Sequence, residues 1–169
     1  YKEFSLKERG VNSFDIFLDH YKEINEKLWG LYRQDLISKD ELRSKRFDLT
    51  LNKYSIKDNE LASKIGDTYV SKSPLQTSLF PYTKEVLSYL KSKYSLSIIT
   101  NGFDEVQKIK LKASGLDVFF DTVITSDFVN AKKPNPTIFN YALNINNVSA
   151  KNSVMIGDDL LVDIIGAKE

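Results

Sequence analysis

The sequence predicts an α/β fold in which a parallel sheet is covered by helices on both faces, giving a three-layer core, with a separate bundle of helices ahead of it. Two observations carry this prediction. Residues 1–76 place apolar side chains at helical spacing, whereas from residue 77 short apolar strands alternate with helices. A polar segment at residues 71–77, which contains Pro74, lies between the two patterns. We therefore expect a helical domain at 1–76 and an α/β domain at 77–169.

Three helices are expected in the first domain. Asn12 or Ser13 can cap the first, the capping box Ser38-Lys39-Asp40-Glu41 opens the second, and the third begins near Asp58. The apolar residues at helical spacing are Phe14, Phe17, Leu18, Tyr21, Ile24 and Leu28 in the first helix, Leu42, Leu49 and Leu51 in the second, and Leu61, Ile65 and Tyr69 in the third.

Strands and helices alternate in the second domain. In chain order we expect a helix from Pro81 through Leu90, a strand at 96–100, a basic helix from Asp104 that Gly115 ends, a strand at 122–125, a helix from Pro136, a strand at 153–156 and a last helix from Leu160. The three strands should be parallel. Ligands of such sheets bind beyond the carboxyl ends of the strands, where Thr100 and Asp158 lie.

Composition excludes several classes of protein. No run of 18 apolar residues could span a membrane, and the absence of cysteine excludes disulfides and thiolate chemistry. His20 is the only histidine, so a site built from several histidines is excluded, and a surface or packing role is expected for it. The net charge of +1 lacks the basic excess of a nucleic-acid binder. We expect a cytoplasmic protein, a monomer or dimer, with neither nucleic acid nor membrane as partner.

Three motifs point to phosphate chemistry. Thr100-Asn101-Gly102 ends a strand with a hydroxyl and backbone N–H groups that can hold an anion. Lys133 is the next motif along the chain, and the prolines at 134 and 136 stiffen the backbone around its ammonium. Gly157-Asp158-Asp159 follows an apolar strand, with Asp163 one helical turn further, and carboxylates so placed can hold a hard divalent cation.

Each motif also has a purely structural interpretation. Asn-Gly is a common turn, Lys133-Pro134 can be a solvated loop, and Asp158 or Asp159 can cap a helix. Their joint occurrence in this order favours the functional interpretation.

The three motifs together resemble the second, third and fourth motifs of the haloacid dehalogenase-like (HAD) hydrolase superfamily. Segments 100–107, 115–116 and 133–139 resemble its pyrimidine 5′-nucleotidase branch. The resemblance covers nearly the whole chain and implies a Rossmann-type core with an inserted helical-bundle cap, formed by the helices at 1–76. It also implies that Thr100 and Lys133 bind the transferring phosphoryl group, and that Asp158, with Asp163 or Asp159, holds Mg²⁺.

The chain departs from the family pattern at one decisive place. The family carries its nucleophile and its acid-base partner as Asp-x-Asp on the first core strand, ahead of the cap, and no Asp-x-Asp occurs in these 169 residues. We therefore expect a core incomplete at both ends, and a piece of a larger phosphatase that is inactive alone. The complete enzyme is expected to hydrolyse small phosphomonoesters, with nucleoside monophosphates first, through an aspartyl-phosphate.

Three alternatives stay open. A 2-haloacid dehalogenase shares the fold but needs no metal, which fits the acidic cluster poorly. A response-regulator receiver uses similar residues, but with its carboxylates first and its lysine last. A non-catalytic binding protein is compatible with the missing nucleophile. Trp29, Tyr32 and Phe103 could contact a substrate base, although core packing is the first expectation for each.

Overall fold

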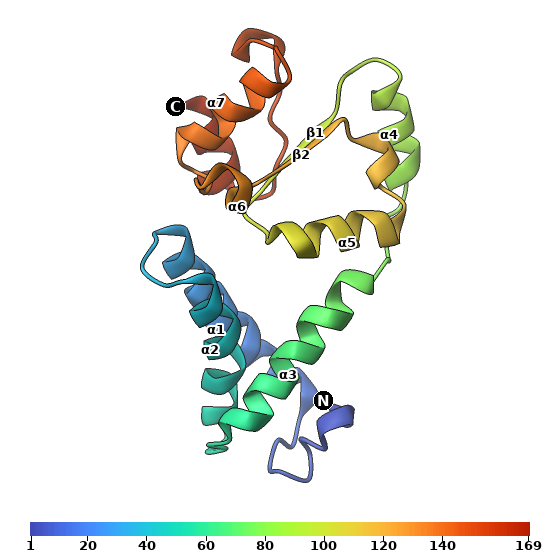
Figure 1. Cartoon of the computed structure of the whole chain (residues 1–169). Helices are drawn as coiled ribbons and strands as arrows, with labels where there is room; N and C mark the ends of the chain where they lie inside the picture. Colours follow the sequence, from blue (N-terminus) through green and yellow to red (C-terminus); the bar gives the residue numbers. More distant parts are fainter. The chain divides into compact units, whose positions relative to one another are not determined.

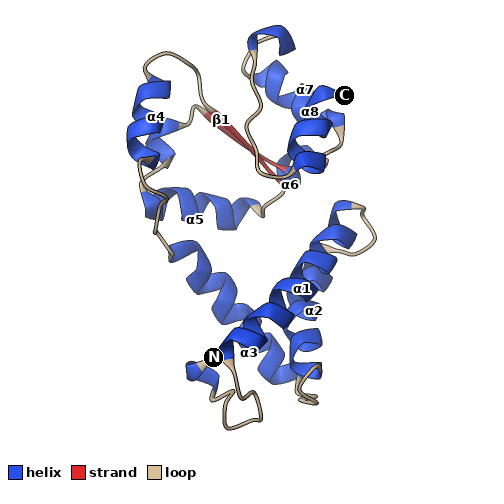
Figure 2. Cartoon of the chain, turned by 180° about the vertical axis from the view of Figure 1, so that it is seen from behind, coloured by secondary structure: helices blue, strands red, loops and turns tan.

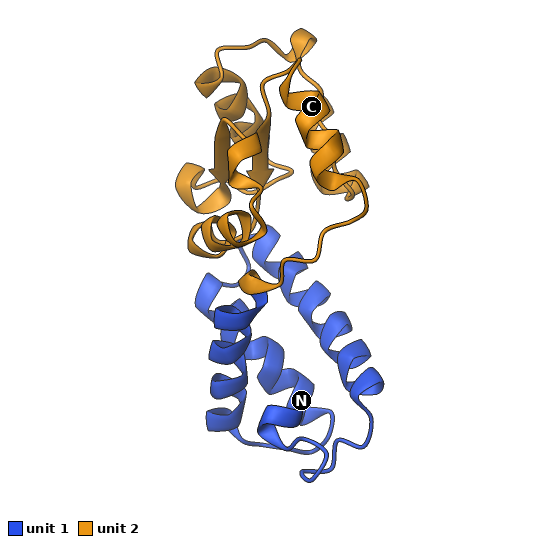
Figure 3. Ribbon diagram, turned by 90° about the vertical axis from the view of Figure 1, so that its right-hand side faces the viewer, with its two compact units in different colours: residues 1–73 blue, residues 74–169 orange.

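The computed structural model describes all 169 residues. The chain forms two compact units, Tyr1–Ser73 and Pro74–Glu169 (Figure 3). The roles of cap and core that the sequence assigns to residues 1–76 and 77–169 stay predictions. None of the helices combines the length and the apolar composition that a membrane-spanning segment needs.

The first unit contains the three expected helices, α1 (Phe14–Arg33), α2 (Lys39–Asn52) and α3 (Asn59–Lys72), after a short 3₁₀ turn at Lys2–Phe4. Figure 1 labels them along the chain. All three helices have a side-chain cap at their N-terminal ends, and the two caps that were predicted, at Ser13 and Ser38, both form. The side chains of Ser13, Ser38 and Asp58 accept hydrogen bonds from the backbone N–H groups of the first helical turns, and Glu41 completes the capping box. Each cap satisfies N–H groups that have no partner inside the helix.

The core of this unit gathers apolar side chains from all three helices and from the segment before α1. Three of the apolar residues predicted at helical spacing are instead exposed: Phe14 is 49% exposed, Leu49 is 41% exposed and Tyr69 is 39% exposed. Phe14 begins the helix, and Leu49 lies just outside the arc of α2 that contains the buried Arg46 and Thr50. The residues that form the core cluster are Leu6, Val11, Phe17, Tyr21, Phe47, Leu51, Leu61, Ala62 and Ile65.

The second unit alternates helices and strands (Figure 2). A 3₁₀ turn at Ser73–Leu75 spans the boundary between the units. The elements that follow are α4 (Thr83–Lys91), β1 (Ser97–Thr100), α5 (Asp104–Ser114), a 3₁₀ turn at Asp117–Phe119, β2 (Thr122–Thr125), α6 (Ser126–Val129), α7 (Pro136–Ile145), a 3₁₀ turn at Ala150–Asn152, a π-helical segment at Leu160–Ile165, and α8 (Gly166–Lys168). Gly115 ends α5 in the left-handed conformation with φ of 65°, as predicted.

The sheet of this unit consists of β1 and β2, which run parallel with Ser97 opposite Thr122 and Thr100 opposite Thr125. This pairing confirms the parallel arrangement predicted for the first two strands. Because the first residues of the two strands pair with each other and so do the last, both strands end in a threonine at the same edge of the sheet. That edge is where the phosphate-binding residues were predicted.

A carboxylate ties together the opposite end of the two strands. Asp121 accepts hydrogen bonds from Ser95 Oγ at 2.7 Å and Leu96 N at 3.1 Å, and it also pairs with Lys91. These contacts, the one with Lys91 first, lower the pKa of Asp121 to about 2. The ionised side chain therefore links the chain entering β1 to the residue just before β2.

The strand predicted at 153–156 does not form. Residues 153–157 have neither helical nor strand structure, and Val154 and Ile156 are 86% and 81% exposed. The local apolar pattern is that of a buried strand, but a strand is defined by hydrogen bonds to a neighbour. In this structure the sheet contains β1 and β2 alone and no strand pairs with the segment; the side chains of Val154 and Ile156 stay at the surface.

Candidate functional site

The end of β1 turns sharply after Thr100. The Thr100 hydroxyl oxygen accepts a hydrogen bond from the backbone N–H of Gly102 at 2.9 Å, which folds the loop back on the strand end. Because a hydroxyl has one hydrogen of its own, Thr100 can still donate to another oxygen while it accepts from Gly102. The predicted role of the Gly102 N–H in holding an anion would require it to exchange partners.

Asn101 joins this loop to Lys133. Its side-chain Nδ2 donates to the carbonyl oxygen of Lys133 at 2.9 Å, and its Oδ1 accepts from the Lys133 N–H at 2.7 Å. The peptide bond from Lys133 to Pro134 is cis. Asn135 then caps α7, and Pro136 stands in its first turn. The loop that carries the lysine is thus held at both sides.

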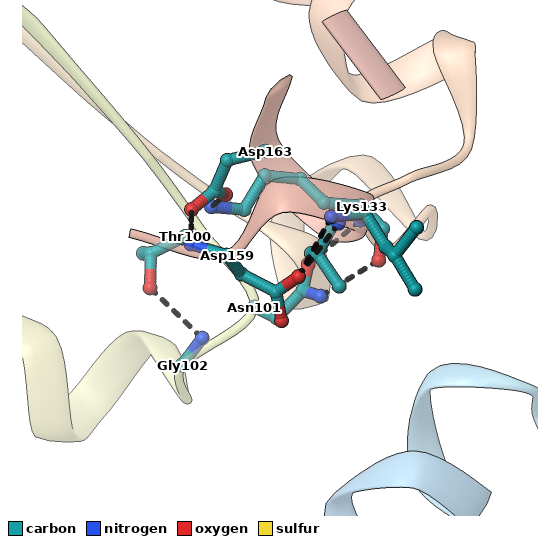
Figure 4. A network of polar contacts seen from close by, with 8 residues as sticks. Thr100, Asn101, Gly102, Lys133, Asp159 and Asp163 are labelled. Atoms are coloured by element: carbon teal, nitrogen blue, oxygen red, sulfur yellow. Dashed lines mark hydrogen bonds and ion pairs between the residues drawn. The ribbon is translucent and has the colours of Figure 1, made fainter. Parts of the chain in front are cut away.

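The Lys133 ammonium forms a buried ion pair. Its Nζ lies 2.5 Å from Oδ1 of Asp163, and the two side chains are only 11% and 6% exposed. The other oxygen of Asp163, Oδ2, accepts from the backbone N–H of Asp159 at 3.2 Å. Figure 4 shows Lys133 and Asp163 pointing toward each other, close to the loop that carries Thr100. Lys133 is therefore restrained at its backbone and at its tip.

Two glycines permit this close packing. A Cβ on Gly157 would lie 2.3 Å from Oδ2 of Asp163, and a Cβ on Gly166 would lie 2.7 Å from the Cβ of Pro134. Any larger residue at either position would push the partners apart. Sequence reasoning did not single out Gly166, because nothing in the local pattern reports that α8 approaches the lysine loop.

The three carboxylates of the predicted metal cluster have different surroundings. Asp159 caps the π-helical segment at Leu160–Ile165, since its Oδ1 accepts from the N–H groups of Leu161 and Val162. Asp163 forms the ion pair with Lys133, and Asp158 is exposed to solvent. No group of three or more His, Cys, Asp or Glu side chains lies together in a way that could hold a metal. The capping alternative therefore describes Asp159, and Asp158 is the carboxylate that remains for a cation.

The carboxylates of this cluster can supply part of a Mg²⁺ site. Mg²⁺ usually keeps several waters and binds proteins through one or two carboxylates together with substrate phosphate oxygens. The exposed carboxylate of Asp158, in the segment that follows residues 153–156, can contribute one such ligand. The remaining ligands would have to come from outside the carboxylates of this cluster.

The aromatic residues considered for substrate contact are largely packed. Phe103 and Tyr32 are each 5% exposed, and Trp29 meets Tyr32 edge-on with ring centroids 5.6 Å apart. His20, in the helical unit, lies 3.1 Å from the hydroxyl of Tyr54 through Nδ1 and packs against its ring. These positions agree with packing roles, as the sequence suggested for each.

Taken together, the geometry suits an anion that carries oxygen atoms. The Lys133 ammonium has three N–H donors, of which one is directed at Asp163, and the Thr100 hydroxyl lies on the loop that Asn101 ties to the lysine. Hydroxyl and ammonium donors of this kind bind phosphate oxygens. Of the predicted site residues, the structure brings together Thr100, Asn101, Gly102, Lys133, Asp159 and Asp163.

Comparisons with known proteins give the same direction. The sequence profile of the haloacid dehalogenase-like hydrolases matches residues 11–169. The chain is 28% identical over 147 residues to the pyrimidine 5′-nucleotidase YjjG of Escherichia coli, which covers 86% of the chain and 64% of YjjG. It is 45% identical over 89 residues to a glyceraldehyde 3-phosphate phosphatase of Pyrococcus abyssi, covering 52% of the chain and 37% of that protein.

The solved structures include a close match. The magnesium-bound crystal structure of the HAD-hydrolase YfnB of Bacillus subtilis superimposes with a TM-score of 0.86 and 27% identity, covering 96% of the chain and 72% of YfnB. In the sequence alignments the chain spans 64% of the full length of YjjG and 63% of the full length of YfnB. The family match extends over nearly all of its residues, and the predicted motifs lie within it. The chain belongs to the haloacid dehalogenase-like hydrolase family.

Proposed function

We propose that the protein is a Mg²⁺-dependent phosphomonoester hydrolase that acts on small phosphate esters, nucleoside monophosphates among them. The observation that carries the proposal is the buried Lys133 ammonium, 2.5 Å from Asp163, on a loop hydrogen-bonded to the residue that follows Thr100. A lysine held in this way offers a fixed positive charge to a dianionic phosphate. The family membership and the phosphatase relatives support the same reaction class.

In this proposal the chain's own residues bind and orient the phosphoryl group. The Thr100 hydroxyl donates to one phosphoryl oxygen, and Lys133 donates to another and offsets the charge that develops in the transition state. Asp163 keeps the ammonium in place through its Oδ1. Burial shields the ammonium from water and lowers the local dielectric constant, so its electrostatic attraction for the phosphoryl oxygens is stronger than that of an exposed lysine.

The metal and the nucleophile complete the proposal. Asp158 would contribute a carboxylate to Mg²⁺, which when bound neutralises negative charge on the phosphoryl group. By the family resemblance, an aspartate of an Asp-x-Asp motif attacks phosphorus, the alcohol leaves, and water then cleaves the aspartyl-phosphate. No Asp-x-Asp lies in these residues, so we assign the nucleophile to a part of the protein outside them.

The test is hydrolysis of an aryl phosphate by the full-length protein with and without Mg²⁺. Lys133→Ala is expected to lower kcat by about 100- to 1000-fold, the usual cost of removing one donor to transition-state charge. Lys151→Ala, which removes an exposed lysine of the same unit, is the control and should stay within about twofold. A turnover that needs no Mg²⁺, or that survives loss of Lys133, would contradict the proposal.

Substrate preference needs its own panel. We expect pyrimidine nucleoside monophosphates to be turned over ahead of sugar phosphates, a ranking supported by segment 100–107 and by the likeness to YjjG. The panel contains deoxyuridine, thymidine and inosine monophosphates, glyceraldehyde 3-phosphate, a hexose phosphate and 2-chloropropionate. Best turnover on a triose or hexose phosphate would replace the substrate class and keep the reaction. Metal-independent chloride release would identify a dehalogenase, and no turnover at all would favour a binding protein.

A further inference from the structure

We propose that Asn101 is a positioning residue, whose side chain fixes the backbone of Lys133 instead of contacting the substrate. The inference rests on the proposed function, because Lys133 is the residue through which Asn101 would act. It assigns to the Asn101 side chain a task different from the phosphate-binding role that the sequence suggested.

The hydrogen bonds use both halves of the amide. Nδ2 of Asn101 donates to the Lys133 carbonyl at 2.9 Å, and Oδ1 accepts from the Lys133 N–H at 2.7 Å. Both lengths are normal for N–H···O bonds. The side chain therefore pairs with the two backbone groups of one residue, 32 positions away, as a neighbouring strand would do. A planar primary amide offers a donor and an acceptor at this spacing, whereas a carboxylate offers acceptors alone.

Lys133 needs such a partner because of where it lies. It belongs to the loop between α6, which ends at Val129, and α7, which begins at Pro136, so no helix or sheet ladder pairs its backbone groups. Lys133 is buried, and buried backbone N–H and C=O groups without partners cost free energy. Asn101 satisfies both groups at once.

Fixing the backbone also fixes the ammonium. A lysine side chain has four rotatable bonds, and its Nζ is well placed only if both ends of the chain are held. Asp163 holds the tip at 2.5 Å, and Asn101 holds the backbone. Asn101 directly follows Thr100, so its hydrogen bonds to the Lys133 backbone connect the residue that carries the hydroxyl to the residue that carries the ammonium. These are the two groups that would bind the phosphoryl oxygens. A displacement of the ammonium by about 1 Å would be enough to lower the rate by about 100-fold.

A double-mutant cycle in the full-length protein tests this role. Asn101→Ala is expected to lower kcat on an aryl phosphate by about 10- to 100-fold, with a smaller change in KM. In a Lys133→Ala background the same change should have no further effect, because the residue through which Asn101 acts is gone. If Asn101 itself bound the phosphate, the two losses would multiply, and that result would overturn the inference.

Asn146→Ala is the matched control. The Asn146 side chain also makes hydrogen bonds within this unit, accepting from Ser97 and Thr122 hydroxyls and donating to the Ala142 carbonyl, but it lies at the opposite end of β1 and β2. Its removal should lower stability and leave kcat within about twofold, since the strand ends that hold the site are unaffected.

A second readout does not depend on activity. Amide hydrogen exchange of Lys133, followed by NMR, should accelerate by about fivefold or more in Asn101→Ala and not in Asn146→Ala, because only the first removes the acceptor of that N–H. An inactive wild-type protein would refute the proposed function, yet this exchange experiment would still test the hydrogen bonds. Unchanged Lys133 exchange in Asn101→Ala would refute the positioning role, whatever the activity of the wild type.

Discussion

Asp163→Ala should destabilise the α/β unit far more than loss of an ordinary ion pair. Lys133 Nζ lies 2.5 Å from Asp163 Oδ1, and the side chains are 11% and 6% exposed. The substitution leaves a buried ammonium without its partner and removes the acceptor of the Asp159 N–H. Breaking a buried pair from one side costs about 3–5 kcal/mol. Replacing both partners by apolar residues, as in Lys133→Met with Asp163→Leu, should recover most of this loss.

The exposed pair of Lys108 and Asp104 in the same unit is the control. Its atoms are 2.6 Å apart, but the side chains are 72% and 35% exposed, so Lys108→Ala should cost at most about 1 kcal/mol. Native-state hydrogen exchange of the β1 amides in the full-length protein measures these differences. Fluorescence of Trp29 does not serve, because that residue belongs to the helical unit. A loss below about 1 kcal/mol for Asp163→Ala would refute the reasoning, since it would mean that solvent already screens the pair.

Three further predictions follow from single contacts. The pKa of Asp121 is about 2 in the folded protein and about 4 in the unfolded chain, so its stabilising contribution is present above pH 4 and is lost as the pH falls through 2. Asp121→Asn should therefore lower Tm at pH 7 and leave Tm nearly unchanged at pH 2. An equal loss of Tm at both pH values would contradict this. Asp158→Asn should weaken the Mg²⁺ dependence of turnover far more than Asp159→Asn does, and equal effects would mean that the pair acts jointly. Gly166→Ala places a Cβ 2.7 Å from a proline Cβ and should cost about 1–3 kcal/mol in thermal unfolding, whereas Gly30→Ala, with no atom within 4 Å, should be neutral or stabilising.

Much of the local structure could be predicted because its causes are local. The predicted caps at Ser13 and Ser38, and the start of the third helix near Asp58, depend on side chains that reach only three residues along the chain. The left-handed end of α5 requires no more than Gly115. The prediction of a strand at 153–156 was wrong because strand formation has a non-local cause. Its apolar residues are typical of a buried strand, but pairing depends on a neighbour that the local pattern does not report.

The candidate site shows the same division. Thr100 could be singled out from its hydroxyl at a strand end, and Lys133 from its charge and the prolines beside it. The structure brings their loops together through Asn101. The pairing of Asn101 with Lys133 could not be predicted, because it joins residues 32 positions apart. Asp159 as a helix cap was one of two interpretations open from the sequence, and only the contacts of its Oδ1 distinguish them.

The most direct test of the account is a crystal structure of the full-length protein with Mg²⁺ and vanadate, a phosphate analogue. We predict that the vanadate oxygens accept hydrogen bonds from the Thr100 hydroxyl and the Lys133 ammonium, with Asp158 among the ligands of Mg²⁺. Lys133 should keep its contact with Asp163, and its backbone should keep both hydrogen bonds to Asn101. Vanadate bound away from Thr100 and Lys133, or Mg²⁺ bound without Asp158, would contradict the account.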